Sequence, residues 1–412
     1  MEKKKRLSLP VLIFLGMLLG IGAGLVFALT GKGEFTTSYI KPFGTIYINL
    51  LKFLVVPVVL FSIIDGIVSL NDLRRVGSVG LRTIVYYMLT TVLAIIIGLV
   101  VANLFKGTFP HLSTVGLEYE PKSSSVMDVI VNIFPSNILA PLVNADMLPL
   151  IVIALLFGAG ILSSGEKGKK IGDLVNCFYE VVMKVMMMVI KISPIGVACL
   201  MCNVVAVNGP EILGSLAIVL GVAYLGYILH VVIVYGLSVR LLGGMSPLKF
   251  FKGLAPAMIC AFTTTSSAAT IPVNMECCNE MGAEPEISSF CLPLGATINM
   301  DGTAIYQAVA AIFIASCYGI DLTIGNMAMI VLTATLASIG TAGAPGSGMI
   351  MLSMVLVSVG LPVEGIALIA GIDKLFDMGR TCLNITGDAT CVMWISRQEK
   401  AKKRRRAPQS IT

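Results

Sequence analysis

Long apolar runs are the feature that most constrains the fold of this 412-residue chain. A helix that crosses a bilayer needs about 20 apolar residues, and only helices or closed barrels can satisfy every backbone polar group there. Eight runs of sufficient length lie near 9–31, 43–70, 78–105, 126–163, 171–207, 212–243, 286–319 and 363–395. The sequence therefore predicts an all-α polytopic membrane protein with eight transmembrane helices.

Charge is scarce and gathers at the two ends of the chain. Only 13% of residues are charged and 56% are hydrophobic, whereas a soluble domain carries about 25% charged residues. Most of the net charge of +6 comes from basic clusters at 3–6 and 400–406, a pattern that does not indicate nucleic-acid binding. Basic ends stay cytoplasmic by the positive-inside bias. We expect a multi-pass protein of the cell membrane, in contact with the lipid bilayer, with both termini cytoplasmic.

Two further segments are apolar but broken, at 253–275 and 327–358. Their breaks, TTTSSAAT at 263–270 and GTAGAPGSG at 340–348, are rich in Gly, Ser, Thr and Ala. Each half is too short for a hydrocarbon core of about 30 Å, and broken backbone at that depth must be satisfied by protein or by a water-filled cavity. Both segments are predicted to be re-entrant helical hairpins.

The two hairpins occupy corresponding places in the chain. The same number of positions separates Ser267 from Asp301 as separates Gly343 from Asp377. Interrupted segments in matching positions of inverted repeats point to a transporter binding site. Helix ends that meet there would offer positive dipoles to a carboxylate and free carbonyls to cations.

The last apolar run carries a stripe of polar side chains about 100° wide. Its members are Asp373, Asp377, Arg380, Thr381, Asn384 and Asp388. An ionised side chain near the bilayer centre costs roughly 2.5–3.5 kcal/mol and usually faces a cavity or ion path. Arg380 offers a planar fork that suits a substrate carboxylate, although an internal ion pair with Asp377 is an alternative. Lys374, at the edge of the stripe, either pairs with an aspartate or lies against another helix.

A second polar group, NMDGT at 299–303, interrupts the seventh run. Asn and Asp side chains and freed carbonyls are hard oxygen ligands that suit an alkali cation. The aspartates of both groups outnumber Arg380, and a dry site cannot hold that charge unless it protonates, binds cations or contains water. Bound sodium is a direct solution. Tyr87, Thr90 and Thr91 in the third run are weaker signals, because such hydroxyls usually bond their own backbone.

Histidine and cysteine do not indicate a metal or redox centre. The two histidines, His111 and His230, are far apart, and the C-x-x-C at Cys199 and Cys202 lies in an apolar, Met-rich run. Buried small hydrophobes are the better interpretation of these cysteines.

Three motifs together resemble the glutamate transporter homologues of the dicarboxylate/amino acid:cation symporters. They are NMDGT at 299–303, SIGTAGAPGSG at 338–348 and D-x-x-x-D-M-G-R-T-x-x-N-x-x-G-D at 373–388. The similarity covers nearly the whole chain. It implies a homotrimer of independent protomers, an elevator-type movement, and a gate formed by the second hairpin.

The resemblance also implies a division into two domains. The scaffold would comprise 1–77 (helices 1 and 2) and 126–211 (helices 4 and 5). The transport domain would comprise 78–125 (helix 3 and a loop) and 212–398 (helix 6, hairpin 1, helix 7, hairpin 2 and helix 8). A basic cytoplasmic tail would follow at 399–412.

The same resemblance implies the ligand contacts. An amino-acid substrate would meet Ser267, Thr303, Gly343, Ala344, Asp377, Arg380, Thr381 and Asn384, with Asp377 at the α-amino group and Arg380 at the side-chain carboxylate. One Na⁺ site would use Gly295, Asn299, Asn384 and Asp388; a second would use Thr297, Ser338, Ile339 and Thr341; a third would use Tyr87, Thr90, Thr91, Asn299 and Asp301.

Some positions depart from the pattern of acidic amino acid carriers. Many carry a second arginine where this chain has Thr265 or Met378, and Lys374 is not expected inside the last helix. A lone Arg380 makes strict selectivity for acidic substrates less secure.

The sequence therefore predicts a sodium-coupled symporter of aspartate or glutamate, with Na⁺ as the coupling ion. The alternatives are a carrier of the same fold for neutral amino acids or C4-dicarboxylates, or one coupled to protons. An intramembrane aspartyl protease is a poorer fit, because those enzymes need a Y-D pair and a G-x-G-D, and here Ile385 precedes Thr386-Gly387-Asp388. We do not expect an enzyme. Saturable uptake would distinguish a carrier from a channel.

Overall fold

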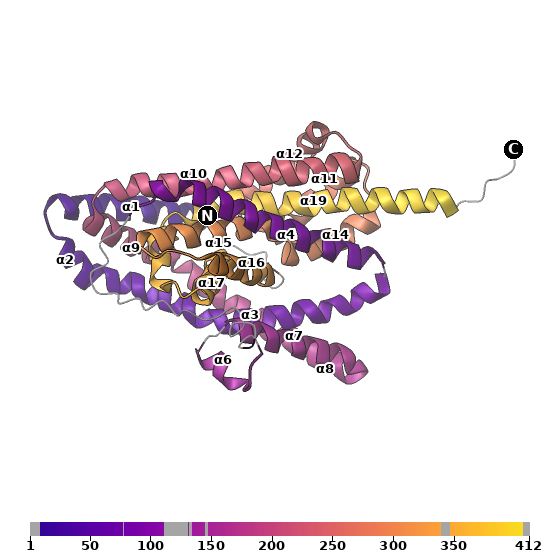
Figure 1. The fold of residues 1–412 in the computed structure, drawn as a ribbon, viewed down its shortest axis with the longest axis horizontal. Helices are drawn as coiled ribbons and strands as arrows, with labels where there is room; N and C mark the ends of the chain where they lie inside the picture. Colours follow the sequence, from indigo (N-terminus) through magenta and orange to yellow (C-terminus); the bar gives the residue numbers. More distant parts are fainter. Residues whose placement is uncertain are drawn as a thin grey trace, which may run out of the picture.

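Every regular element in the described part of the chain is helical, as the apolar runs predict. The computed structural model describes residues 9–406 apart from 77, 111–130, 132–133, 145–146 and 339–346. Long helices lie side by side along the long axis of the molecule (Figure 1), and α19 (Asp373–Arg406) extends beyond the others at one end.

One group of helices packs around α3. It contains α1 (Leu9–Leu29), α2 (Gly33–Phe35), η1 (Thr36–Ile40), α3 (Lys41–Val76), α6 (Leu139–Asn144), α7 (Met147–Ser163), α8 (Gly165–Lys191) and α9 (Ser193–Asn208). Helix α3 contacts α7, α8 and α9, and α1 lies along α9. A Cβ atom added at Gly20 would lie 2.4 Å from the carbonyl oxygen of Ala198. Gly16, Gly20 and Gly24 of α1 thus serve close packing against α9.

The second group packs around α15. It contains α4 (Ser78–Phe105), η2 (Lys106–Thr108), α10 (Glu211–His230), η3 (Val231–Tyr235), α11 (Gly236–Ser238), η4 (Val239–Gly243), α12 (Pro247–Thr264), α13 (Ser267–Glu280), α14 (Pro285–Ile298), α15 (Asp301–Cys317), α16 (Ile324–Ser338), α17 (Ser347–Ser358), η5 (Val363–Gly365), α18 (Ile366–Ala370) and α19. All 17 residues of α15 are buried. Because α4, α10, α16, α17 and α19 all contact it, α15 forms the centre of this group.

Both segments predicted to be hairpins consist of two packed helices. Helix α12 packs on α13, and the chain turns at Thr265 and Ser266. Thr265 has φ of +54°, and the Ser266 hydroxyl accepts a hydrogen bond from the Ala269 N–H at 3.2 Å, which caps α13. Helix α16 likewise packs on α17, and the predicted tip between them, at 339–346, lies outside the described residues.

The last apolar run differs from the single helix predicted over 363–395. The structure divides it into η5, α18 and α19, with a turn at Gly371 and Ile372. A Cβ at Gly371 would lie 2.0 Å from the sulfur of Met201, so this turn passes directly against α9. At the other end the helix continues to Arg406, because Gln, Glu, Lys, Ala and Arg are good helix formers. The predicted tail at 399–412 is therefore helical as far as Arg406.

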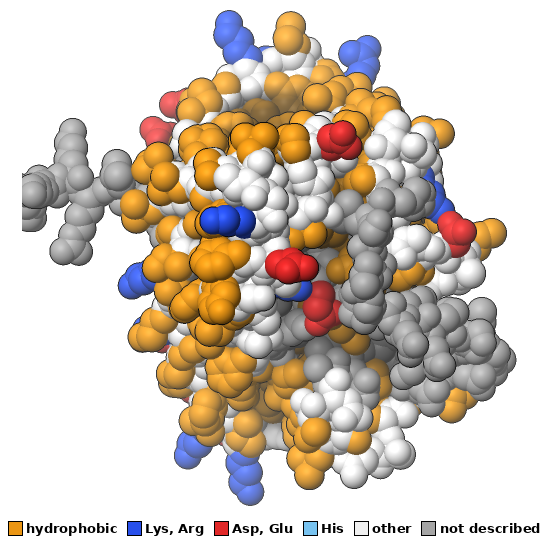
Figure 2. Space-filling model, turned by 90° about the vertical axis from the view of Figure 1, so that its left-hand side faces the viewer, with side chains coloured by type: hydrophobic (Ala, Val, Ile, Leu, Met, Phe, Trp, Pro, Cys, Tyr) orange, Lys and Arg blue, Asp and Glu red, His pale blue; other side chains and the backbone are white. Residues whose placement is uncertain are grey.

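Four helices among the described residues are long and apolar enough to cross a membrane. They cover Val11–Leu29, Val79–Thr108, Glu211–Gly243 and Pro285–Cys317, and α8 with α9, bent by 51°, adds a fifth if the pair is one span. The count of eight crossings stays a prediction. Figure 2 shows the end of the molecule nearest α2, where hydrophobic side chains cover much of the visible surface and charged ones are scattered.

Candidate functional site

Asp301, in the first turn of α15, is a fully buried carboxylate with three side-chain partners. The Thr91 hydroxyl donates to its Oδ1 at 2.7 Å, and the Tyr235 hydroxyl donates to its Oδ2 at 2.7 Å. His230 Nε2 lies 3.2 Å from the same Oδ2. Buried carboxylates need such partners, because an ionised group without them loses its hydration uncompensated.

The π-helical segment η3 explains how α10 brings two side chains to Asp301. His230 and Tyr235 are five positions apart and would point about 140° away from each other on an α-helix. In η3 their rings meet edge to face, with centroids 4.7 Å apart. From the sequence, His230 was considered only as a metal ligand, and its contact with Asp301 was not predicted. A π segment leaves no trace in a 3.6-residue apolar pattern, so no periodic signal was available.

Asn299 joins the helix break between α14 and α15 to α19. Its side-chain amide donates to Asp388 Oδ1 at 2.8 Å and to the Asn384 carbonyl at 3.1 Å. A Cβ at Gly295 would lie 2.3 Å from Asp388 Oδ1, so this carboxylate packs directly on the backbone of α14. The structure thus brings together the four residues predicted for one Na⁺ site: Gly295, Asn299, Asn384 and Asp388.

The residues of the third predicted Na⁺ site lie beside this group. Thr90 Oγ1 is 3.5 Å from Asn299 Oδ1 and also bonds the Tyr87 carbonyl, while Thr91 bonds Asp301. The Tyr87 hydroxyl donates to the Cys291 carbonyl at 3.0 Å. The hydroxyls of Tyr87, Thr90 and Thr91 therefore point at α14 and α15, and of these three Thr90 also bonds its own helix.

The second predicted Na⁺ site is described only in part. Ser338 Oγ donates to the Ile298 carbonyl at 2.5 Å and accepts from the Met300 N–H at 3.3 Å, so the end of α16 meets the helix break. The Thr297 side chain is exposed and donates to the Leu294 carbonyl. Ile339 and Thr341 lie outside the described residues.

Arg380 is buried between two aspartates of its own helix. Its Nε donates to Asp377 Oδ1 at 2.8 Å, and its Nη1 and Nη2 lie 3.1 and 3.4 Å from the two oxygens of Asp373. The guanidinium also lies over the Tyr306 ring, 4.9 Å from the centroid. The internal ion pair considered for Asp377 is therefore present and extends to Asp373, so a bound carboxylate would have to share these donors.

The other described residues predicted to contact the substrate come from α13, α15 and α19. Asn384 Oδ1 accepts from the Gly302 N–H at 2.7 Å, and Thr381 Oγ1 donates to Asp377 at 3.3 Å. Thr303 and Ser267 are buried at the starts of α15 and α13. Gly343 and Ala344 fall outside the described residues, but α17 begins nearby, since a Cβ at Gly348 would lie 2.3 Å from Arg380 Nη1.

Lys374 is the residue whose placement the sequence left open. It pairs with an aspartate, since its ammonium is 3.8 Å from Asp377 Oδ2, and it also meets another helix. The same ammonium donates to Thr265 Oγ1 at the tip of the first hairpin. Lys374 thus adds a second positive charge to the cluster of Asp373, Asp377 and Arg380.

The chemistry of the donors favours a hard cation. Among the described residues, no group of three or more His, Cys, Asp or Glu side chains is placed to hold a metal ion. A cation between Asp301 and Asp388 would instead use carboxylate, amide, hydroxyl and backbone oxygens, which suit alkali ions better than transition metals.

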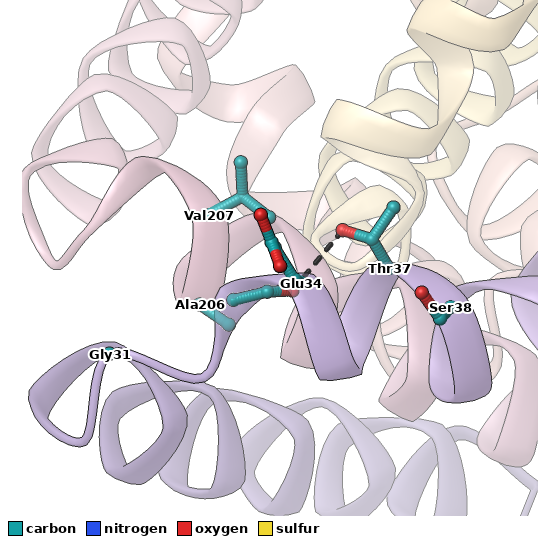
Figure 3. Close-up of a pocket in the computed structure, with 7 residues that line it drawn as sticks. Gly31, Glu34, Thr37, Ser38, Ala206 and Val207 are labelled. Atoms are coloured by element: carbon teal, nitrogen blue, oxygen red, sulfur yellow. Dashed lines mark hydrogen bonds between the residues drawn. The ribbon is translucent and has the colours of Figure 1, made fainter.

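A separate pocket of about 520 Å³ lies where α2 meets the end of α9 (Figure 3). Its lining residues are Gly31, Gly33, Glu34, Thr37, Ser38, Ala206 and Val207. The Thr37 hydroxyl bonds the Gly33 carbonyl at its edge. Among the described residues, none of the predicted site residues lines this pocket, and Glu34 is the single charged side chain in its lining.

Charged residues also fasten the far end of α19 to its neighbours. Arg82 of α4 bonds both Gln398 and Glu399, and Lys403 lies 3.0 Å from Glu284. Burial alone would raise the pKa of Glu399, but hydrogen bonds from Arg82 and Lys402 outweigh it and lower that pKa below its usual value. This end of the second group is thus held together by ion pairs.

The sequence matches known transporters along almost its whole length. A proton/sodium-glutamate symport protein of Geobacillus stearothermophilus is 35% identical over 96% of this chain and 95% of its own. The proton/glutamate-aspartate symporter of Escherichia coli is 35% identical over 98% and 96%. Excitatory amino acid transporter 3 of mouse is 32% identical over 92% and 83%.

A family model, that of the sodium:dicarboxylate symporter family, matches residues 9–398. This match confirms the resemblance that rested on the motifs at 299–303, 338–348 and 373–388. It also confirms the prediction of a transporter rather than an enzyme, because the family is one of symporters. The chain belongs to the sodium:dicarboxylate symporter family.

Proposed function

We propose that this protein is a sodium-coupled symporter that accumulates aspartate or glutamate across the cell membrane. The observation that carries the proposal is the convergence of α15 and α19. Buried Asp301 and Asp388 face the same helix break at Asn299, and Arg380 lies two turns before Asp388 on α19. Groups that would bind a cation and a group that would bind a carboxylate are therefore neighbours in one buried region.

The proposed ligand roles follow from the donors of each group. Asp301, Asp388, Asn299, Asn384, Thr90 and Thr91, with the carbonyls at Gly295 and Thr297 and near Ser338, would hold Na⁺. Arg380 would take the side-chain carboxylate of the substrate, and Asp377 its α-ammonium. The named relatives support this choice, since they are symporters of glutamate or of glutamate and aspartate.

The proposed architecture has eight crossings and two re-entrant hairpins, α12–α13 and α16–α17, with both termini cytoplasmic. The packing supports a scaffold built on α1, α3 and α7–α9 and a transport domain built on α4, α10 and α12–α19. We propose that the transport domain moves against the scaffold as an elevator, in a homotrimer of independent protomers, and that the second hairpin is the gate.

Uptake by proteoliposomes tests the proposal. An inward Na⁺ gradient should drive saturable uptake of labelled aspartate or glutamate, and an inward proton gradient without Na⁺ should not. The second condition matters because several relatives are named for both protons and sodium. Uptake that responds only to the proton gradient would refute sodium coupling. Na⁺-driven uptake of labelled serine or succinate, without uptake of aspartate or glutamate, would identify the neutral and dicarboxylate alternatives.

Substitution of Arg380 tests the substrate assignment. Arg380→Cys should abolish aspartate uptake and favour serine, because the fork that binds the side-chain carboxylate is gone while Asp377 remains. Arg397→Cys is the matched control: Arg397 lies on the same helix but bonds the carbonyls of Leu241 and Leu242, away from the cluster. An unchanged aspartate affinity in Arg380→Cys would refute the role given to this side chain.

A further inference from the structure

The Lys374 side chain connects the last helix to the tip of the first hairpin. It lies in the first turn of α19 with its side chain 11% exposed. Its ammonium donates to the Thr265 hydroxyl and lies 3.8 Å from Asp377 Oδ2. Among the described residues, Thr265 is the one non-glycine with positive φ. Left-handed backbone of this kind is unfavourable for most side chains and gathers at functional sites.

The two oxygens of Asp377 have different surroundings. Oδ1 accepts from Arg380 Nε and from the Thr381 hydroxyl. Oδ2 faces the Lys374 ammonium at a distance that is short enough for an ion pair but too long for a hydrogen bond. Asp377 Oδ2 is therefore the oxygen with capacity for one more donor, and an ammonium already stands beside it.

We propose that Lys374 is an internal substitute for the α-ammonium of an amino-acid substrate, so that the site also accepts C4-dicarboxylates. The proposal rests on the proposed function, because it uses the same carboxylate pocket at Arg380. When an amino acid binds, its own ammonium pairs with Asp377 Oδ2, and Lys374 stays on Thr265. When a dicarboxylate without an amino group binds, Lys374 pairs with Asp377 in its place.

The charge balance of the cluster supports this role. Asp373 and Asp377 are balanced by Arg380 and Lys374, all of them largely buried. An acidic amino acid brings two carboxylates and one ammonium, whereas a C4-dicarboxylate brings two carboxylates alone. A buried site accepts the second, more negative ligand only if a positive group remains for Asp377, because an unpaired buried carboxylate is costly.

The test is a competition experiment with succinate as the dicarboxylate probe. Na⁺-driven uptake of labelled aspartate into proteoliposomes is inhibited by unlabelled succinate or by unlabelled aspartate, and the ratio of the two inhibition constants is measured. Lys374→Met keeps most of the length of the side chain and removes its charge. It should weaken succinate relative to aspartate by about tenfold, the effect of losing one charge-assisted contact. Lys374→Arg should retain most of the wild-type ratio.

A second variant moves the ratio the other way. Thr265→Ala removes the hydroxyl that holds the Lys374 ammonium off Asp377. The freed ammonium should compete with that of aspartate, so that succinate gains relative to aspartate by about threefold or more. This variant tests the proposal even if Lys374→Met does not fold.

The outcomes are distinct. A ratio unchanged in both variants, or equal losses for both ligands, would mean that Lys374 is only a tether between hairpin and helix, and would overturn the proposal. Wild-type protein that takes up aspartate and ignores succinate would overturn it too, while leaving the proposed function intact. Wild-type uptake of succinate alone would refute the proposed function. Lys374 would then be judged by whether Lys374→Met, but not Lys374→Arg, loses succinate uptake.

Discussion

The hydrogen bond from Tyr235 to Asp301 should stabilise the sodium-free protein more than the sodium-bound protein. Tyr235→Phe removes one hydroxyl and leaves a ring of nearly the same shape. In the structure that hydroxyl donates to Asp301 Oδ2 at 2.7 Å, and both groups are fully buried. His230 and Thr91 remain as partners of the carboxylate, so the variant weakens a network rather than removing it.

The expected magnitude follows from the charge of the acceptor. A hydrogen bond to a charged group contributes about 1.5–3 kcal/mol, so the ion-free form should lose roughly that much stability. A carboxylate that already binds Na⁺ is a weaker acceptor, so the sodium-bound form should lose less. The difference between the stability losses of the two forms appears as tighter sodium binding by Tyr235→Phe, by up to about tenfold for each 1.4 kcal/mol.

Thermal unfolding of the purified protein measures both effects. Tyr235→Phe and wild type are compared in choline chloride and across a NaCl titration at constant ionic strength. The midpoint temperature of Tyr235→Phe should be lower without Na⁺ and should approach wild type at saturating Na⁺.

Tyr47→Phe is the matched control for this experiment. Tyr47 is also buried, but its hydroxyl bonds a neutral partner, Ser193, at 3.0 Å in the first group of helices. It should lower the midpoint by the same amount at every Na⁺ concentration. If Tyr235→Phe behaved like Tyr47→Phe, or if it bound sodium more weakly than wild type, the reasoning about Asp301 would be wrong.

Two further substitutions, one of them with a matched control, test the packing and the charged end of α19. Gly302→Ala places a Cβ 2.3 Å from the Arg380 carbonyl oxygen, so it should cost about 1–3 kcal/mol and reduce aspartate uptake. Gly221→Ala, with nothing within 4 Å, should leave both unchanged or improve stability slightly, and equal effects would contradict this. Glu399→Gln should lose up to about 1 kcal/mol at neutral pH. Because the folded pKa of Glu399 is lowered, this contribution is present above the ordinary glutamate pKa and disappears as the pH falls through the folded value; a deficit that persisted at low pH would refute it.

Residue type and position along the chain were enough to predict the helical class and where several polar groups meet. Asn299 and Asp388 come from different helices, yet both were singled out because hard oxygen ligands are unusual inside apolar runs. The small residues at 340–348 and the hydroxyls at 263–270 likewise predicted the two helix pairs. These signals are local, so a single sequence carries them.

The contacts that were missed depend on features that a residue pattern does not encode. His230 reaches Asp301 because η3 widens the helix for one turn, and Lys374 reaches Thr265 because the hairpin tip adopts a left-handed conformation. The start of α19 at Asp373 depends on Gly371 passing against Met201. Each is a tertiary effect, in which a local departure from regular α-helical backbone is stabilised by a distant segment.

The position of Asn384 gives a physical basis for coupling between cation and substrate. Arg380, Asn384 and Asp388 follow one another at four-residue intervals on one face of α19. Asn384 accepts from Gly302 through its side chain and from Asn299 through its carbonyl, so it bonds both ends of the α14–α15 break. On the proposed function, a cation bound by Asn299 and Asp388 would therefore act on the residue one turn from the guanidinium. Since coupling between two binding equilibria is reciprocal, substrate bound at Arg380 should tighten the cation site by the same factor. On this proposal, coupling needs no distant relay, because one turn of α19 would belong to both sites.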